Sequence, residues 1–361
     1  MREDRRGRTP RRLALTAAGV LVGTLGLTGC GTSAESAALP TSMTALVKQA
    51  KKEGEVDWVV PKPQEQMQPA IDLFEKKYPG IKVKYTNTKP GDEVSQLKVE
   101  QAAKKVSIDV GNAGGLSVTP SATLAADTDW SKYGIDDENI FAENFVYVWA
   151  TPKVWAYNTD KVKPADVPKT WDDLLGSAWS DGRISAESRA SFLAAWHLDP
   201  SMGDKKALAW AEKFAAQEPH YSPDLSQAEA PIESGQVSIG TSLANQVLAA
   251  KDKGAPVDIA PISPTSANES YVFVPKGAPH PAAGALLTSF LSSEEAQSAL
   301  AKTYNSRIPV TTDCADPDGI PVLQAVCKAN LKWFPTSTLR DYNSLSSLFT
   351  KAEKVLGTNV S

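Results

Sequence analysis

The chain has 361 residues, of which 38 are basic and 42 are acidic, so its net charge at neutral pH is −4. This weakly acidic balance argues against nucleic-acid binding, which depends on clustered basic side chains. A chain of this length exceeds what one hydrophobic core normally serves, so two lobes are expected.

The first 29 residues have the composition of an export signal. Residues 1–12 contain six arginines, and residues 13–28 then run without a charge. The order basic, apolar, small is typical of a signal peptide, and the run is shorter than the roughly 20 apolar residues of a spanning helix. A retained membrane span is the alternative. Arg11 and Arg12 resemble a twin-arginine signal, so the export route stays open between that pathway and the general one.

The four residues Leu27-Thr28-Gly29-Cys30 resemble the bacterial lipobox. The resemblance implies that the Cys30 thiol is acylated, that residues 1–29 are removed, and that residues 30–42 form a tether. Two acyl chains suffice for stable anchoring, so membrane lipid is an expected partner, at the outer face of the cytoplasmic membrane. Cleavage removes six basic and two acidic residues, which leaves 32 and 40 and a net charge of −8.

After the tether, helix and strand patterns alternate, which predicts an α/β architecture. A helix over 43–54 places Leu46, Val47 and Ala50 on one face with Gly54 as its C-cap, and a strand follows over 55–60. A capping box is predicted at Ser292 and Glu295. The other predicted elements are helices over 66–80, 94–105, 188–198, 241–254, 281–291 and 292–302, and strands over 81–87, 106–111, 182–186 and 236–240.

Several segments in this order resemble bacterial extracellular solute-binding proteins of ABC importers. They include "AIDLFEKKYPGIKVKY", "VWAYNTDKV", "SGQVSIGTSLANQVLAAKDKGAPVDIAPISP" and "VPKGAPHPAAGALLTSFLSSEEAQSALA", within about residues 52–310. The subgroup they resemble most is the ferric-iron-binding-like branch of the type II periplasmic-binding proteins. That resemblance implies two α/β lobes, two crossover strands acting as hinges, and a solute held in the cleft between the lobes.

The same resemblance predicts the lobe boundaries and the partners. The first crossover is expected near residues 146–158 and the return near 260–274. Lobe one would combine residues 43–152 with 266–361, and lobe two would be 153–265. The resemblance further implies a monomeric receptor that captures a small polar solute, anionic or hydroxylated, and delivers it to an ABC permease without making or breaking a bond.

Four loops are predicted to contact the solute, because ligands in open α/β sheets bind beyond the carboxyl ends of the strands. These loops cover residues 61–66, 111–115, 186–191 and 240–246. Three of them open helices, whose free N–H groups favour an anion. With two aromatic residues of the first crossover and one polar residue of the return, the candidate ligand residues are Lys62, Gln64, Asn112, Trp155, Tyr157, Ser188, Arg189, Ser191, Thr241, Ser242, Asn245 and Asn268.

Several of these candidates also have a structural interpretation. Arg189 offers a bidentate fork to a carboxylate or phosphate, or is a solvated surface charge, and Ser188 is a ligand group or an N-cap. Asn112 contacts the solute or occupies a left-handed turn, and one hydroxyl of the 240–246 loop is expected to cap the following helix. Trp155, like the other crossover aromatics, stacks on a sugar or encloses a cation, or packs in the core.

Iron is disfavoured as the solute. Ferric-binding relatives place adjacent tyrosines at the strand-to-helix junction where this chain reads "GTSLANQVL". An alternative iron site would combine Glu65 or Glu187 with Tyr157 or Tyr271. No cofactor and no resident metal are expected otherwise.

Motifs of enzyme chemistry are absent from the sequence. His197, His220 and His280 lack zinc-type spacing, and no G-x-S-x-G elbow, P-loop or C-x-x-C pair occurs. A lipid-anchored envelope hydrolase and a structural envelope module remain the alternatives to a receptor. In an oxidising compartment Cys314 and Cys327 predict a disulfide, with two free buried thiols as the alternative.

Overall fold

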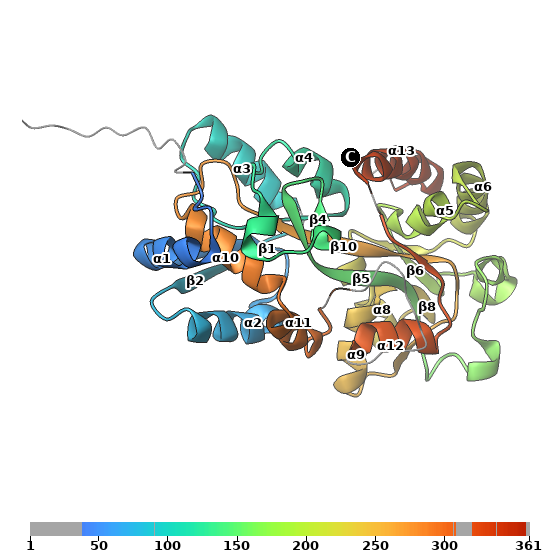
Figure 1. Ribbon diagram of the computed structural model, residues 1–361. Helices are drawn as coiled ribbons and strands as arrows, with labels where there is room; N and C mark the ends of the chain where they lie inside the picture. Colours follow the sequence, from blue (N-terminus) through green and yellow to red (C-terminus); the bar gives the residue numbers. More distant parts are fainter. Residues whose placement is uncertain (1–37, 90, 306, 308–319, 337, 359–361) are drawn as a thin grey trace, which may run out of the picture. The chain divides into compact units, whose positions relative to one another are not determined.

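The computed structural model describes residues 38–361 except 90, 306, 308–319, 337 and 359–361 (Figure 1). The predicted signal peptide, the lipidation of Cys30 and the disulfide partner Cys314 lie outside the described residues and stay predictions. Within the described residues, none of the helices has the length and apolar character needed to span a bilayer.

Helices and strands alternate along the chain, as predicted. The helices are α1 (Met43–Glu53), α2 (Gln64–Lys77), α3 (Asp92–Ala102), α4 (Val118–Ser121), α5 (Ala194–Leu198), α6 (Asp204–Ala215), α7 (Leu225–Ala228), α8 (Ala230–Glu233), α9 (Ala244–Asp252), α10 (Pro281–Leu291), α11 (Glu294–Ala301), α12 (Pro321–Lys328) and α13 (Leu339–Leu356). The strands are β1 (Glu55–Val60), β2 (Lys82–Asn87), β3 (Gly111–Gly114), β4 (Ile140–Phe141), β5 (Phe145–Asn158), β6 (Ile184–Glu187), β7 (His220–Ser222), β8 (Ile239–Leu243), β9 (Val257–Ile259), β10 (Thr265–Phe273) and β11 (Trp333–Phe334).

Two long strands connect the sheet regions. The first half of β5, residues 146–152, pairs antiparallel with β10, and its second half, residues 153–158, pairs antiparallel with β8 and β9. β3 adds to β10, while β6 and β7 extend the sheet beyond β8. β1 and β2 form a separate parallel pair. The predicted two-lobed α/β fold with two crossover strands is confirmed, with β5 and β10 as the crossovers.

Separate hydrophobic clusters lie on either side of these crossovers. The first core packs β1, α2 and α10 together around Trp58, Phe74 and Phe290. The second core packs aromatic side chains of β5, the segment before β6, and α6, among them Trp155 and Trp210. Tryptophan supplies a large apolar area in each, which is the main term in the stability of such cores.

The C-terminal helices pack near the second half of β5. α13 contributes Leu345, Leu348 and Phe349 to the second core, and α12 contributes Val322 and Val326 to the cluster that contains α9 and β9. Sequence analysis assigned the whole chain after residue 266 to lobe one. The lobe boundaries stay a prediction, and the packing of α12 and α13 favours lobe two for residues 321–356.

Several predicted boundaries differ from the structure. Residues 111–115, predicted as a loop, include the strand β3, because their backbone pairs with β10 and Gly111 leaves room for the Phe273 ring, which lies 2.8 Å from where a Cβ would stand. β8 runs to Leu243, so α9 begins three residues later than predicted. The cap of α11 is Ser293, whose hydroxyl accepts the Ala296 N–H, so the predicted capping box at Ser292 is wrong.

Candidate functional site

The loop after β1 contains a lysine, Lys62, that lacks a counter-charge within the part of the chain that the structure describes. The carbonyl of Lys62 accepts a hydrogen bond from the Tyr85 hydroxyl, which ties the loop to β2. Among the described residues the Lys62 side chain has neither a hydrogen bond nor an ion pair, and burial lowers its pKa to about 8. Gln64 is exposed in the first turn of α2 and donates to Gln68 at 3.0 Å. Lys62 is therefore the group in this loop that can attract an anion.

The segment after β6 is organised by a buried carboxylate. Ser191 donates both its hydroxyl and its backbone N–H to Glu187, and burial raises the pKa of that carboxyl. The Ser188 hydroxyl donates to the Pro223 carbonyl at 3.5 Å, and no helix begins there for it to cap. Arg189 is exposed; burial raises the pKa values of Glu187 and Glu353, and the charge of Arg189 opposes that rise.

A group of buried ionisable residues lies on and beside the crossover strands and is called here the crossover cluster: Lys153, Glu187, Glu269, Tyr271 and Tyr342. The Lys153 ammonium donates to the Ser191 carbonyl at 3.1 Å, and burial lowers its pKa against the attraction of Glu187 and Glu269. Glu269 accepts from the Thr336 N–H at 2.8 Å and from the Tyr342 hydroxyl at 3.2 Å. Burial raises the pKa of Glu269 to about 7.

The crossover cluster joins the two crossover strands to the C-terminal helix. Lys153 comes from β5, Glu269 and Tyr271 come from β10, and Tyr342 comes from α13 (Figure 1). Sequence analysis did not identify Lys153, Glu269 or Tyr342. A signal was available for two of them, because Lys153 and Glu269 are the charged residues in runs 148–156 and 265–274, which are otherwise uncharged and are predicted as buried crossovers.

The candidates on β8 and α9 are buried and polar. The Thr241 hydroxyl accepts the Glu187 N–H at 2.9 Å, and the Ser242 hydroxyl donates to Glu229 at 3.0 Å. Neither caps α9, whose N-cap is Leu243 without a side-chain bond. Asn245 donates to Asn305 at 3.4 Å, but its Oδ1 has no donor within the described part of the chain.

The remaining candidates lie on the strands themselves. The Asn112 amide donates to the Tyr271 carbonyl at 3.0 Å, so it helps hold β3 to β10 and is not in a left-handed turn. Asn268 is half-buried opposite Thr151. Trp155 contacts the rings of Trp171, Phe192 and Phe214 in the second core, and Tyr157 is buried in the same cluster.

The two tyrosines named for the alternative iron site do not favour the phenolate form. Burial raises the pKa of Tyr157, and it raises that of Tyr271 as well, so each phenol resists the deprotonation that Fe³⁺ binding requires. Glu65 is exposed on α2, whereas Glu187 is buried at the end of β6. That one of these glutamates forms an iron site with one of these tyrosines stays a prediction.

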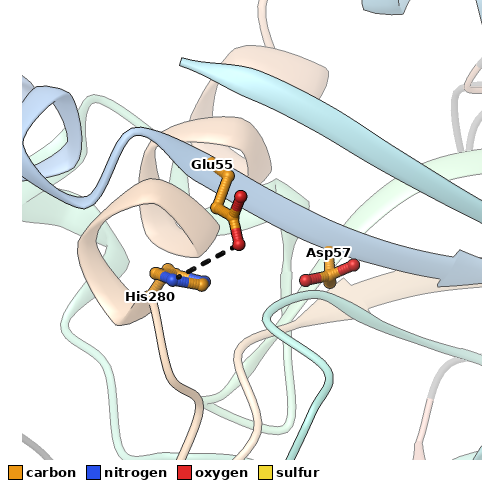
Figure 2. A group of neighbouring side chains, drawn as sticks. All are labelled: Glu55, Asp57 and His280. Atoms are coloured by element: carbon orange, nitrogen blue, oxygen red, sulfur yellow. Dashed lines mark ion pairs between the residues drawn. The ribbon is translucent and has the colours of Figure 1, made fainter. Parts of the chain in front are cut away.

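A second ionisable group lies at the amino end of β1 (Figure 2). Glu55, Asp57 and His280 place one oxygen or nitrogen atom each within 4.8 Å of one another. His280 directly precedes α10, as sequence analysis expected, but its neighbours on β1 were not foreseen because they are over 200 residues away in the sequence. A separate cavity of about 310 Å³, lined in part by Leu39, Asp127 and Lys276, contains none of the predicted ligand residues.

Two α/β lobes joined by crossover strands define the class of two-lobed solute receptors. Residues 69–325, more than half of the chain, match the bacterial extracellular solute-binding protein family. The chain therefore belongs to this family, whose members are solute-binding components of ABC transport outside the cytoplasm. Among proteins with curated descriptions, none matches the chain.

Solved structures show the same fold at low sequence identity. The substrate-binding protein of an ABC transporter from Agrobacterium tumefaciens is 17% identical, with a TM-score of 0.69 over 85% of this chain and 96% of that one. Iron-bound HitA from Pseudomonas aeruginosa is 21% identical, with a TM-score of 0.64 over 83% and 99%. AgtB from A. tumefaciens R10, in complex with agropinic acid, is 19% identical, with a TM-score of 0.63 over 83% and 99%. These likenesses establish the fold and leave the solute open.

Proposed function

We propose that the chain is a lipid-anchored, monomeric receptor that binds a small anionic or hydroxylated organic solute by lobe closure. It delivers this solute unchanged to an ABC permease in the membrane, and it is not an enzyme. The observation that carries the solute class is the Lys62 ammonium, which follows a strand of the β1–β2 pair and has no counter-charge among the described residues.

Lys62 favours an anion for an electrostatic reason. Its pKa of about 8 reflects burial, and no acidic side chain in the described part of the chain offsets the cost of the charge. An anionic group of the solute supplies that missing counter-charge and forms a charge-assisted hydrogen bond. Solute binding is therefore favoured because it offsets the desolvation cost of the Lys62 charge in the free protein.

Asn245 supports a solute that also bears hydroxyl or amine groups. Its side chain is 4% exposed, and its Oδ1 has no donor in the described part of the chain. A buried acceptor left without a donor costs on the order of 1–3 kcal/mol. A hydroxyl of the solute would remove this cost, as agropinic acid or a similar polyfunctional compound would allow by analogy with AgtB.

Retained solute gives the most direct test. Native mass spectrometry of protein purified without refolding should detect a small organic anion, and its addition to stripped protein should raise Tm and reduce the radius of gyration in X-ray scattering. A retained ferric ion would support the iron alternative. Conversion of the solute into a product would support the hydrolase alternative. An unchanged radius of gyration with every solute tested would support the structural-module alternative.

The role of Lys62 can be separated from that of general surface charge. Because the anion needs a protonated partner, affinity for the retained solute should fall as pH rises through about 8. Lys62→Arg should remove that fall, since arginine stays protonated, and Lys62→Gln should weaken binding at every pH. Lys48→Gln, on an exposed position of α1, is the matched control and should leave binding unchanged. Equal affinity of the Lys62→Gln variant and the parent would contradict the proposal.

The anchoring and the disulfide are tested apart from the solute. Cys30→Ala should abolish membrane attachment while the protein still folds and binds solute. Mass spectrometry of peptides from unreduced protein should identify a Cys314–Cys327 bond. Cys30→Ala protein that stays in the membrane fraction would contradict lipid anchoring.

A further inference from the structure

The His280 imidazole lies beside the amino end of β1, and the buried Asp109 carboxylate fixes its orientation through Nδ1. Asp109, which is fully buried, accepts the His280 backbone N–H at 2.6 Å and lies 2.9 Å from the imidazole Nδ1. A carboxylate only accepts hydrogen bonds, so Nδ1 carries the proton and neutral His280 presents the lone pair of Nε2. Nε2 lies 3.8 Å from Glu55 Oε1.

Two carboxylates of β1 share the face toward His280. Glu55 and Asp57 are two residues apart on a strand, so their side chains leave the same side, and Figure 2 shows them beside the imidazole. The half-buried Asp57 carboxylate has no hydrogen bond or ion pair in the part of the chain that the structure describes. Burial and the charges of Asp109 and Glu55 raise its pKa.

Helix capping does not account for these carboxylates. Glu53 accepts the N–H groups of Ala282 and Ala283 in the first turn of α10, and Asp109 accepts that of His280. Glu53 and Asp109 therefore already cap the free N–H groups and stabilise the positive end of the α10 dipole. Glu55 and Asp57 add negative charge beyond this need, and the cation near them is Lys84, 2.7 Å from Glu55.

We propose that Glu55, Asp57 and His280 form a binding site for a divalent transition-metal cation of the zinc type, with His280 Nε2 and one oxygen of each carboxylate as ligands. One imidazole and two carboxylates are a donor set that zinc accepts, and three protein ligands leave a position for water. Asp109 is the outer partner that fixes the imidazole, as in carboxylate–histidine–zinc arrangements. The Lys84 side chain is 54% exposed, so its ammonium can move into solvent when the cation binds.

The cation links parts of the chain that are distant in sequence. Glu55 and Asp57 belong to the first strand, whereas His280 follows the return crossover and begins α10. Binding joins β1 to α10 within the first core and stabilises the folded chain by mass action. The site is at the end of β1 opposite Lys62, so it is independent of the proposed solute site.

Zinc titration of the full chain by calorimetry tests the site. We expect one Zn²⁺ per chain, and Glu55→Gln should weaken binding by at least about tenfold, the loss that even outer partners of metal ligands produce. Lys84→Gln should tighten binding, because it removes the competing ammonium. Glu295→Gln is the matched control, since Glu295 is an exposed carboxylate paired with one lysine, Lys77, at 2.7 Å. Unchanged circular dichroism and Tm without zinc would show that each variant folds.

The chain has three histidines, so nitrogen-15 labelling of histidine identifies the ligand directly. Zinc should shift the Nε2 signal of one imidazole, and that signal should be absent from His280→Gln. Absence of stoichiometric binding would overturn the proposal, as would equal affinity of Glu55→Gln and the parent. A zinc-induced shift at His197 or His220 would also overturn the proposal. So would zinc binding without any histidine shift, which is what thiolate ligands would give.

Discussion

Replacing Glu269 by glutamine should stabilise the protein above neutral pH. Glutamine keeps the shape of the side chain and an oxygen that can accept the Thr336 N–H, but it cannot ionise. In the parent, burial raises the pKa of Glu269 from its ordinary 4.5 to about 7. The folded state therefore holds a proton that the unfolded state releases, and stability is lost as pH rises from about 4.5 to about 7.

The size of the effect follows from these two pKa values. At about 1.4 kcal/mol per pH unit, ionisation of Glu269 costs the parent roughly 2–3 kcal/mol between pH 5 and pH 8. The Gln variant lacks this loss. Lys153 still has the Ser191 carbonyl as acceptor and the charge of Glu187 nearby, so its ammonium is not left without partners.

Urea unfolding at pH 5, 6, 7 and 8, without solute, measures the free energy of unfolding of both proteins. The difference between the two curves isolates Glu269, because burial also raises the pKa values of Glu93 and Glu229 to about 7 in both proteins. Glu295→Gln, at an exposed carboxylate, should follow the parent. Parallel pH profiles for parent and Glu269→Gln would refute the assignment of the shift to this residue.

Three further substitutions test the packing. Gly240→Ala should cost about 1–3 kcal/mol, because a Cβ there would lie 2.0 Å from Ser185 Oγ and 2.8 Å from its carbonyl; an unchanged Tm would contradict this. Thr338→Ala should cost about 1 kcal/mol through loss of the α13 cap, while Thr350→Ala on an exposed turn of that helix should cost clearly less. Trp171→Ala should cost about 3–5 kcal/mol in urea unfolding, since the side chain is buried and bonded to the Pro264 carbonyl; a loss below 1 kcal/mol would show that the second core repacks.

Elements with local signals were predictable from the sequence. The helix α1 follows from the spacing of its apolar residues and from Gly54, which takes the left-handed conformation at its end. The bounds of α10 agree with the prediction because Pro281 marks its start and its sequence is apolar on nearly all sides. In both helices the information lies within one segment, so no distant contact has to be known.

Elements that depend on distant partners were not predictable in the same way. Residues 111–114 are rich in glycine and predict a turn, yet they form β3 because the edge of β10 is available to pair with them. Thr241 and Ser242 have the composition of a helix start, but they lie in β8 between β5 and β6. The Thr241 hydroxyl accepts the N–H of Glu187 on β6, and the Ser242 hydroxyl donates to Glu229 before α8. Tertiary pairing overrides local preference at both places.

The two groups of ionisable residues differ in how their charge is balanced, and that difference separates their roles. In the crossover cluster Glu269 has two hydrogen-bond donors and responds to burial by holding a proton near pH 7. At the amino end of β1, the half-buried Asp57 carboxylate has no donor among the described residues, and one of its oxygens lies within 4.8 Å of ligand atoms of Glu55 and His280. A proton satisfies the first arrangement, whereas the second places ligand atoms of three side chains within 4.8 Å of one another, which suits the proposed cation. Acidification should therefore stabilise the folded protein through the crossover cluster, because the Glu269 carboxyl takes up a proton below about pH 7.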